Sequence, residues 1–284
     1  MTRQHSMLSI FTFALVCALS VGILDSQAKQ PDSKHAKRED TAFALQYQAL
    51  LETSVQLTAS KIDARISLLK HIAESTANDP FIHDWLAKGS PAAEQSLLLE
   101  KLQFLVNNNQ LTSASFADKA TNGYWNHEGF LRVLQPETDT WYFAYLESGQ
   151  QDLVSVYHDK NKKRVDLYVN YQQIDGDGLS GIATSFDSIL GLLKTTLPQS
   201  LQSNMANAAQ PKVVLVDGEG IVQVAASYES LQGAHVSSVV PSQTLSALMN
   251  QNDINRAITA DNNALYLSSY LPNMQWYLMV VIEH

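Results

Sequence analysis

Aromatic and amide side chains cluster in two short segments of this sequence, and these residue types line small-molecule pockets in proteins. The cluster consists of Trp141, Tyr142, Tyr145, Tyr168, Asn170 and Tyr171, and all of these except Tyr168 are candidate ligand-binding residues. Aromatic rings provide apolar walls, while Tyr hydroxyls and Asn amides orient a ligand through hydrogen bonds. Core packing explains the same residues equally well. Because successive strand residues point to opposite faces of a sheet, only one of Asn170 and Tyr171 can face a given pocket.

A Gly-x-Gly-x-x-Gly pattern runs from Gly176 to Gly181 and matches the dinucleotide-binding fingerprint in spacing. That fingerprint needs a helix after it and an acidic residue about 20 positions further on. Here β-like residues follow, and residues 199–202 contain no acid. Asp175 and Asp177 begin a calcium-loop pattern, but its later ligands are not placed correctly. A hairpin turn explains both patterns.

The chain lacks the sequence motifs of a zinc site or a hydrolase. No two of its interior histidines have the i,i+4 helical spacing that binds zinc, and no cysteine accompanies them. These histidines are His71, His83, His127, His158 and His235. No Gly-x-Ser-x-Gly nucleophile motif is present. We therefore expect no metal, no cofactor and no catalytic residue, and we predict that the protein is not an enzyme.

Composition indicates an ordinary globular protein with an acidic surface. Apolar residues make up 45% of the 284 residues and charged residues 17%, which excludes intrinsic disorder as the dominant state. The formal net charge is −9 at pH 7. Such a surface repels phosphate groups, so nucleic acid and anionic lipid headgroups are not expected as partners.

The N-terminus has the pattern of an export signal. Arg3 precedes an apolar run over residues 7–24, and Ser26-Gln27-Ala28 places small residues at positions −3 and −1 of a cut. This predicts a signal peptide over residues 1–28 and a mature periplasmic protein without Cys17, the only cysteine. The alternative is an uncleaved inner-membrane anchor facing the periplasm, because the run is close to the lower limit of a membrane span. No second such run follows, so we expect signalling to need another protein.

The first half of the mature chain has helical periodicity. Residues 29–40 are polar and charged and predict a linker. Residues 41–76 predict a long helix, because apolar side chains recur at steps of three, four and seven. Two shorter helices are expected, one over 81–88 and one from the Ser90-Pro91 start signal to about residue 106.

From residue 111 the pattern changes to short β-like runs separated by turn residues, which is typical of antiparallel meanders. The first series occupies 113–118, 129–134, 153–158, 164–174 and 179–186. A helix over 187–200 connects it to a second series, which includes a helix over 241–251. The strands of the second series occupy 212–216, 221–226, 265–270 and 276–282. This order predicts an α+β fold with a long N-terminal helix followed by two modules with antiparallel sheets.

Several short motifs, in this order and spacing, resemble the double Cache (PAS-like) sensor regions that lie outside the membrane in bacterial diguanylate cyclases and chemoreceptors. Together they cover about residues 45–284. The motifs are Asn78-Asp79-Pro80-Phe81, Gly123-Tyr124-Trp125, Gly129-Phe130-Leu131, Asp139-Thr140-Trp141-Tyr142-Phe143, Leu167-Tyr168-Val169-Asn170-Tyr171, Gly181-Ile182-Ala183, Val214-Leu215-Val216-Asp217 and Trp276-Tyr277-Leu278-Met279-Val280.

The resemblance implies how the chain is divided and where a ligand would bind. It implies a membrane-distal module over 41–200, which includes the long helix, and a membrane-proximal module over 201–284. It also implies that Trp141-Tyr142 begins a short helix over the sheet and lines a cavity. Trp125 and Asp187 join the candidate ligand-binding residues on the same basis.

One departure from the family concerns the ligand. Amino-acid-binding members resemble one another in an Arg just before the Trp-Tyr pair and an Asp after a Gly-Val step. Here Asp139-Thr140 precedes Trp141, Arg132 lies further upstream, and Asp187 falls one residue late. The pattern therefore does not predict an amino-acid ligand.

The functional prediction is a periplasmic small-molecule sensor without its own output domain. It would signal through a membrane receptor such as a cyclase, a phosphodiesterase or a kinase, and its ligand is unknown. The alternative is a ligand-independent interaction module that regulates such a receptor. The long helix could pair two copies into a homodimer, as in sensor relatives, although packing on its own sheet explains its apolar stripe equally well.

Overall fold

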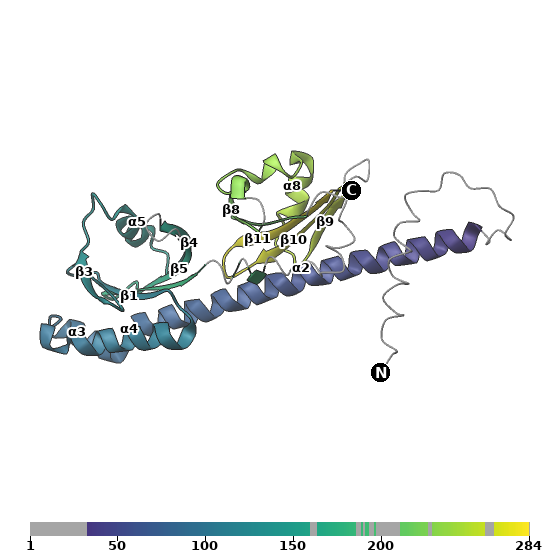
Figure 1. Ribbon diagram of the computed structural model, residues 1–284. Helices are drawn as coiled ribbons and strands as arrows, with labels where there is room; N and C mark the ends of the chain where they lie inside the picture. Colours follow the sequence, from purple (N-terminus) through teal and green to yellow (C-terminus); the bar gives the residue numbers. More distant parts are fainter. Residues whose placement is uncertain are drawn as a thin grey trace, which may run out of the picture.

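The computed structural model is an elongated α+β molecule in which one long helix runs beneath two antiparallel sheets (Figure 1). It describes residues 33–159, 164–185, 189, 191–192, 196, 211–226, 229–258 and 264–283. The predicted signal peptide and most of the predicted connecting helix lie outside these residues. The predicted α+β architecture is confirmed. Among the described residues, no helix combines the length and apolar character that crossing a membrane requires.

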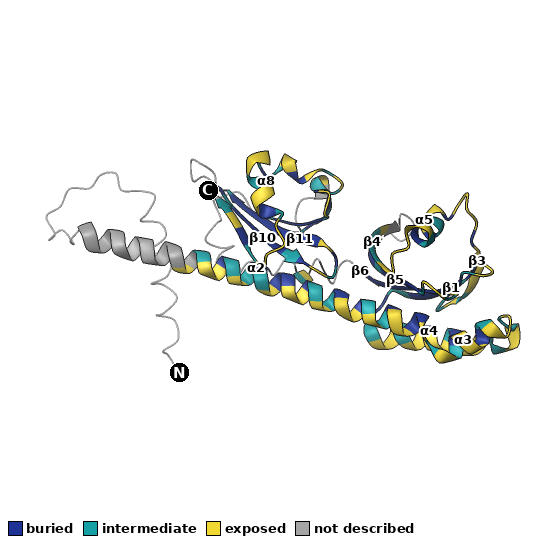
Figure 2. Ribbon diagram, turned by 180° about the vertical axis from the view of Figure 1, so that it is seen from behind, coloured by how far each residue is buried: buried dark blue, intermediate teal, exposed yellow. Residues whose placement is uncertain are grey.

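The long helix, α2, spans Ser33–Ala77 and begins inside the segment that we expected to be a linker. Residues 33–40 contain no Pro or Gly and are rich in Lys, Arg, Ala and Glu, which favour helix, whereas Pro31 lies just before them. One stripe of α2 is buried against both sheets (Figure 2). Its buried members include Val55, Ile62, Ile66, Leu69 and Ala73.

Helix α3 (Pro80–Ala87) reverses the chain after α2. The Asp79 carboxylate caps it by accepting a hydrogen bond from the Phe81 amide at 2.8 Å. The same carboxylate pairs with Lys101 at 2.7 Å, on helix α4 (Gln95–Asn109). This one acidic side chain therefore joins the start of α3 to the middle of α4.

Our prediction that Ser90 caps the third helix, with Pro91 as its first residue, is wrong. Ser90 has a φ of 55°, and its amide donates to the Trp85 carbonyl oxygen, so it completes the turn that ends α3. A short 3-10 turn, η1 (Ala92–Glu94), comes between that turn and α4. The Ser90-Pro91 signal therefore lies close to the start of the third helix, but Ser90 belongs to the turn that ends α3 and does not cap α4.

The first sheet has the order β3-β2-β1-β6-β5-β4, and all its neighbours are antiparallel. Its strands are β1 (Ser113–Asp118), β2 (Gly123–Asn126), β3 (Gly129–Val133), β4 (Asp152–Asp159), β5 (Arg164–Gln172) and β6 (Gly178–Ser185). The sequence pattern did not indicate β2, because its four residues follow directly on a turn signal. β2 lies between β1 and β3, so β3 is an edge strand of this sheet.

The second sheet has the order β8-β7-β11-β10-β9. Its strands are β7 (Lys212–Val216), β8 (Val222–Ala225), β9 (Asn255–Ile258), β10 (Ala264–Leu271) and β11 (Trp276–Glu283). Helix α8 (Ser242–Leu248) and the 3-10 turns η2 (Glu229–Leu231) and η3 (Val236–Ser238) cover its outer face. β9 was not predicted, since Asn255 and Arg256 give its four residues little β-favouring character, unlike the Val-rich β8 of the same length.

Polar contacts attach α2 to both sheets. The Asp63 carboxylate accepts hydrogen bonds from Asn273, from the backbone amide at 2.8 Å and from Nδ2 at 2.7 Å, in the turn between β10 and β11. Lys70 pairs with Asp152, the first residue of β4, at 2.8 Å. The long helix therefore has specific contacts with each module besides its apolar stripe.

Candidate functional site

Helix α5 (Thr140–Ser148) lies over the face of the first sheet that points away from α2 (Figure 1). Two tyrosines hold it there. The Tyr142 side chain is fully buried, and the Tyr145 hydroxyl donates to the Gln151 carbonyl oxygen at 2.8 Å. Gly149 ends the helix with a φ of 64°. A residue with a Cβ would be strained in this left-handed conformation, whereas glycine adopts it freely.

A pocket of about 690 Å³ opens between α5 and the sheet. We call it the α5 pocket. This volume suits a small organic ligand. The residues that line it are Tyr124, Arg132, Trp141, Ala144, Tyr145, Ser148, Gln150, Leu153, Ser155, Val156, Tyr157, Tyr168 and Asn170.

Three of the candidate residues from the sequence lie together on the α5 pocket. Trp141 and Tyr145 reach it from α5, and Asn170 reaches it from β5. Trp141 is 43% exposed, so it forms part of the rim, whereas Asn170 is 5% exposed and lies on the floor. Alternation along β5 places Asn170 on this face and Tyr171 on the other. The structure thus brings these three side chains to one site, and their role in binding stays a prediction.

The other candidates do not line the α5 pocket. Tyr142 packs beneath α5 in a small core with Leu134 and Leu179. Tyr171 lies on the α2 side of the sheet. Trp125 also lies on the α2 side, with its ring centroid 5.1 Å from that of Trp85. Asp187 lies outside the described residues.

Arg132 is a pocket residue that sequence reasoning set aside. The β2–β3 hairpin pairs Arg132 with Tyr124, and both residues line the α5 pocket together with Trp141. Its Nη2 donates to the Asp139 carboxylate at 2.5 Å. Asp139 is 1% exposed, and it also accepts from the Gln135 amide at 3.0 Å and the Thr138 hydroxyl at 3.1 Å. If β2 had been recognised as a strand, the β2–β3 hairpin would have placed Arg132 beside Tyr124 and so near the predicted site.

The Arg132–Asp139 pair should make the stability of the fold depend on pH. The hydrogen bond from Arg132 holds the pKa of Asp139 below its ordinary value, so the folded state favours the carboxylate. The resulting stability is present above the unfolded-state pKa of about 3.9 and is lost as the pH falls through the lowered folded-state value.

We therefore expect Asp139→Asn to reduce the free energy of unfolding at pH 7 by about 2 kcal/mol. At pH 3 the gap between variant and wild type should be smaller. Urea unfolding at the two pH values measures both gaps. An equal gap at pH 3 and pH 7 would contradict the assignment of this stability to the charged carboxylate.

Burial raises the pKa of three tyrosines in this region, Tyr124, Tyr142 and Tyr145, so they keep their protons at neutral pH. Burial, and secondarily the charge of Asp118, raises the pKa of Tyr142 to about 12. Burial likewise raises the pKa of Tyr145 and of Tyr124. These hydroxyl groups therefore serve as neutral hydrogen-bonding groups and do not act as bases near pH 7.

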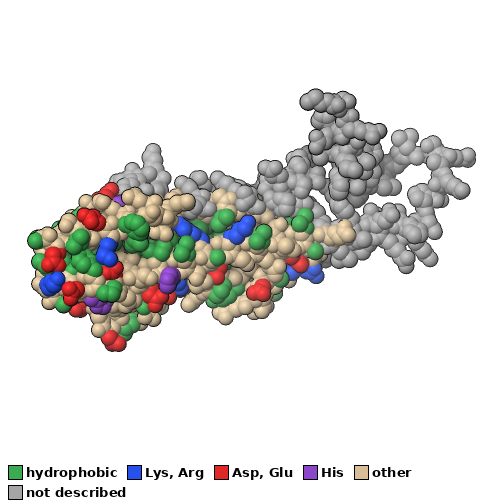
Figure 3. All heavy atoms as spheres, turned by 90° about the horizontal axis from the view of Figure 1, so that it is seen from below, with side chains coloured by type: hydrophobic (Ala, Val, Ile, Leu, Met, Phe, Trp, Pro, Cys, Tyr) green, Lys and Arg blue, Asp and Glu red, His purple; other side chains and the backbone are tan. Residues whose placement is uncertain are grey.

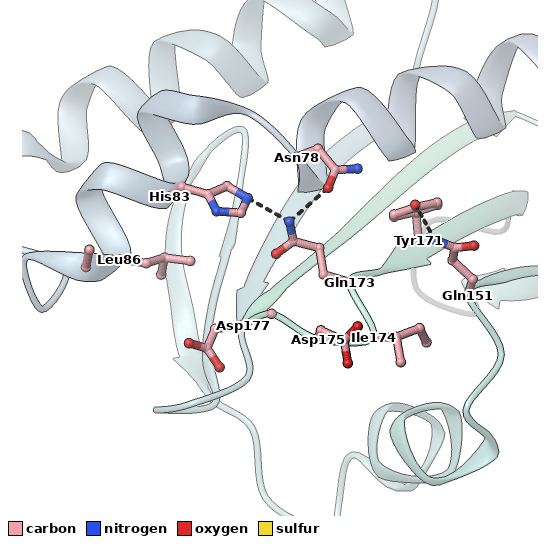
Figure 4. A pocket seen from close by; sticks show the side chains of 11 residues that line it. Asn78, His83, Leu86, Gln151, Tyr171, Gln173, Ile174, Asp175 and Asp177 are labelled. Carbon is pink, nitrogen blue, oxygen red and sulfur yellow. Dashed lines mark hydrogen bonds between the residues drawn. The ribbon is translucent and has the colours of Figure 1, made fainter.

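A second hollow of about 540 Å³ lies at the distal tip, where α2 and α3 meet the β5–β6 turn (Figure 4). Its polar side chains are already engaged with one another. The Gln173 amide nitrogen donates to the Asn78 side-chain oxygen at 2.9 Å and lies 2.6 Å from His83 Nε2. Gln151 donates to the Tyr171 hydroxyl at 2.5 Å. In this hollow, which we call the tip cleft, hydrogen bonds between polar side chains connect the helices to the sheet.

Metal binding finds no support at either hollow. In the part of the chain that the structure describes, no group of three or more His, Cys, Asp or Glu side chains could hold a metal ion. Asp175 and Asp177, considered above as a fragment of a calcium loop, lie in the exposed turn beside the tip cleft. The α5 pocket is the stronger candidate site, because its lining is mainly apolar and aromatic.

Comparison with known proteins identifies the fold. No protein-family model matches the sequence. The ligand-binding domain of the Campylobacter jejuni chemoreceptor Tlp3, in complex with 4-methylisoleucine, aligns with a TM-score of 0.56 and 14% identity over 84% of this chain and 92% of that one. The ligand-binding domain of the Pseudomonas aeruginosa PAO1 amino acid chemoreceptor PctC, in complex with GABA, aligns with a TM-score of 0.54 and 16% identity, covering 81% and 96%.

A third solved structure extends this similarity beyond chemoreceptors. A domain of a putative sensory box/GGDEF family protein from Vibrio parahaemolyticus aligns with a TM-score of 0.54 and 12% identity, covering 83% of this chain and 98% of that one. The chain therefore has the fold of bacterial sensory and ligand-binding domains over nearly the whole length of each. The resemblance to double Cache sensor regions predicted this fold, and the prediction is confirmed.

Proposed function

We propose that this protein is a non-enzymatic sensory domain that binds a small molecule in the α5 pocket. The observation that carries the proposal is the pocket itself, in which Trp141, Tyr145 and Asn170 converge from a helix and a strand. Its volume of about 690 Å³ and its mainly apolar lining are those of a ligand site. Solved domains of the same fold include ligand-binding domains of chemoreceptors.

We further propose that the domain works outside the cytoplasm with a membrane receptor. The export signal over residues 1–28 supports a periplasmic location, and the structural neighbours belong to chemoreceptors, histidine kinases and a GGDEF protein. A cyclase, a phosphodiesterase or a kinase is thus the proposed partner. The pocket would belong to a distal module over 41–200, and residues 201–284 would form the proximal module.

The contacts of α2 provide a route from the pocket to the rest of the molecule. Leu153 lines the pocket, and its neighbour Asp152 forms the ion pair with Lys70 of α2. Further along the same helix, Asp63 holds the β10–β11 turn of the second sheet through Asn273. A ligand that binds one arrangement of α5 and β4 more tightly would shift the equilibrium between two positions of α2. The free energy of that shift cannot exceed the difference between the ligand's binding free energies for the two arrangements.

A second candidate function is protein interaction through the outer face of α2 and α4. Apolar side chains lie among charged ones on this face (Figure 3). Leu57 is 53% exposed, Leu68 46% and Phe104 64%. Such side chains favour either a homodimer or a receptor that covers this face in a ligand-independent way. A stable membrane partner recovered in a pull-down without added ligand would support this reading.

The ligand-binding proposal is tested by filling the pocket. We expect a metabolite library to contain a compound that stabilises the wild type, by about 2.7 kcal/mol at 100 times its dissociation constant. Ala144→Trp should abolish the thermal shift, because Ala144 lines the pocket. Glu147→Trp is the matched control, since Glu147 is exposed on the same helix and does not line the pocket. Equal shifts in both variants would place the ligand elsewhere and contradict the proposal.

A further inference from the structure

The walls of the α5 pocket suit a flat or apolar body. Among the lining residues, Tyr124 and Trp141 form an edge-to-face pair with ring centroids 6.3 Å apart. Tyr157 and Tyr168 form a second such pair at 6.0 Å. Leu153 contributes an aliphatic surface on β4. Aromatic rings arranged in this way attract planar and apolar groups.

The charge of the pocket is balanced within the protein. Among the described residues that line it, Arg132 is the only one with a charged side chain. Its partner Asp139 is 1% exposed and already accepts three hydrogen bonds. The pair is therefore neutral overall, and a ligand carboxylate that used the remaining N–H groups of Arg132 would add an unbalanced negative charge beside Asp139. A ligand ammonium would meet no carboxylate among those lining residues, and burying an unpaired charge is unfavourable.

The Asn170 side chain is a polar group without a partner. It is 5% exposed and lines the pocket floor. Within the described part of the chain, no group forms a hydrogen bond with its side-chain amide, although its backbone is fully part of β5. Because this amide opens onto the pocket, it presents a donor and an acceptor side by side to a ligand.

We infer that the α5 pocket takes an uncharged, mainly apolar or aromatic ligand that pairs with Asn170 through an adjacent donor and acceptor. A carboxamide, a cyclic amide or the edge of a nucleobase has this chemistry. The inference rests on the proposed function and narrows it, because the chemoreceptor domains of the same fold were solved with the charged compounds 4-methylisoleucine and GABA. Here the neutral ion pair and the unpartnered amide favour a different class of ligand.

Three probes of nearly identical shape separate the possibilities. Benzamide is neutral and has an adjacent donor and acceptor, benzoate is an anion with acceptors only, and benzamidine is a cation with donors only. Binding to the full-length mature protein is measured by ligand-observed NMR up to about 10 mM, since ligands this small reach only millimolar affinity. We expect benzamide to bind at least about tenfold more tightly than benzoate and benzamidine.

Variants connect the selectivity to Asn170. Asn170→Asp replaces the amide with an acceptor-only anion of the same shape, so the preference should invert in favour of benzamidine. Asn108→Asp is the matched control, because Asn108 is exposed on α4 and makes the same change of charge outside the pocket. Ala144→Trp should abolish binding of benzamide. A purely structural role of Asn170 would lower the affinity for all three probes without inverting their order.

The outcomes distinguish this inference from the proposed function. Tighter binding of benzoate or benzamidine to the wild type would overturn the inference and leave the pocket as a ligand site. An unchanged order in Asn170→Asp would remove Asn170 as the recognising group and overturn it equally. Binding of none of the probes would overturn this inference, while the library screen decides the proposed function separately. Binding that survives Ala144→Trp would place the ligand outside the α5 pocket and overturn both.

Discussion

Tyr142→Ala is expected to lower the free energy of unfolding by about 3–5 kcal/mol, which is the usual loss for a large aromatic residue removed from a core. Tyr142 is fully buried beneath α5, and its hydroxyl donates to the Asn122 side-chain oxygen at 3.3 Å. The ring fills a small core with Leu134 and Leu179 that anchors α5 to the sheet. Urea unfolding monitored by circular dichroism measures the loss.

The neighbouring residue provides the control for this prediction. Trp141 is 43% exposed and lines the pocket rim, so Trp141→Ala should cost much less stability and should weaken ligand binding directly. The sequence analysis placed both residues among the ligand-binding candidates, and their positions in the structure separate them. Similar losses of stability in the two variants would contradict the assignment of Tyr142 to the core and Trp141 to the pocket.

Periodic patterns were sufficient to predict the long helix and most strands. The stripe through Val55, Ile62 and Leu69 recurs over many turns, so chance matches are improbable, and these side chains are buried as expected. Strands β1 and β7 coincide with their predicted bounds. The four-residue strands β2 and β9 were missed although each pairs with a strand next to it in sequence. Both are short and contain Gly or Asn, which are disfavoured in strands.

The candidate site was predictable only where a local rule applied. Alternation along β5 separated Asn170 from Tyr171, and the structure places them on opposite faces. No local rule could orient α5, because Trp141, Tyr142 and Tyr145 are all aromatic and leave no polar face to mark the solvent side. Arg132 was missed for a different reason. Its approach to Trp141 depends on the hairpin formed with β2, which is a tertiary feature.

Gly181 shapes the floor of the pocket, so Gly181→Ala should affect both stability and binding. On β6 it is paired with Ser115 of β1 on one side and with Asn170 of β5 on the other. A Cβ at this position would lie 2.7 Å from the Ser115 Oγ and 2.8 Å from the Asn170 Oδ1. Such distances are too short for van der Waals contact, so both side chains would have to move.

We expect Gly181→Ala to cost about 1–3 kcal/mol of stability through overpacking. Because Asn170 cannot keep its position, we also expect affinity for any ligand that it recognises to fall by about tenfold or more, a change of about 1.4 kcal/mol. Gly218→Ala is the matched control. A Cβ there would meet only the Gln275 carbonyl oxygen at 3.7 Å, so stability should change by less than about 0.5 kcal/mol. A Gly181→Ala variant that unfolds more easily but binds with wild-type affinity would show that the pocket floor does not take part in recognition.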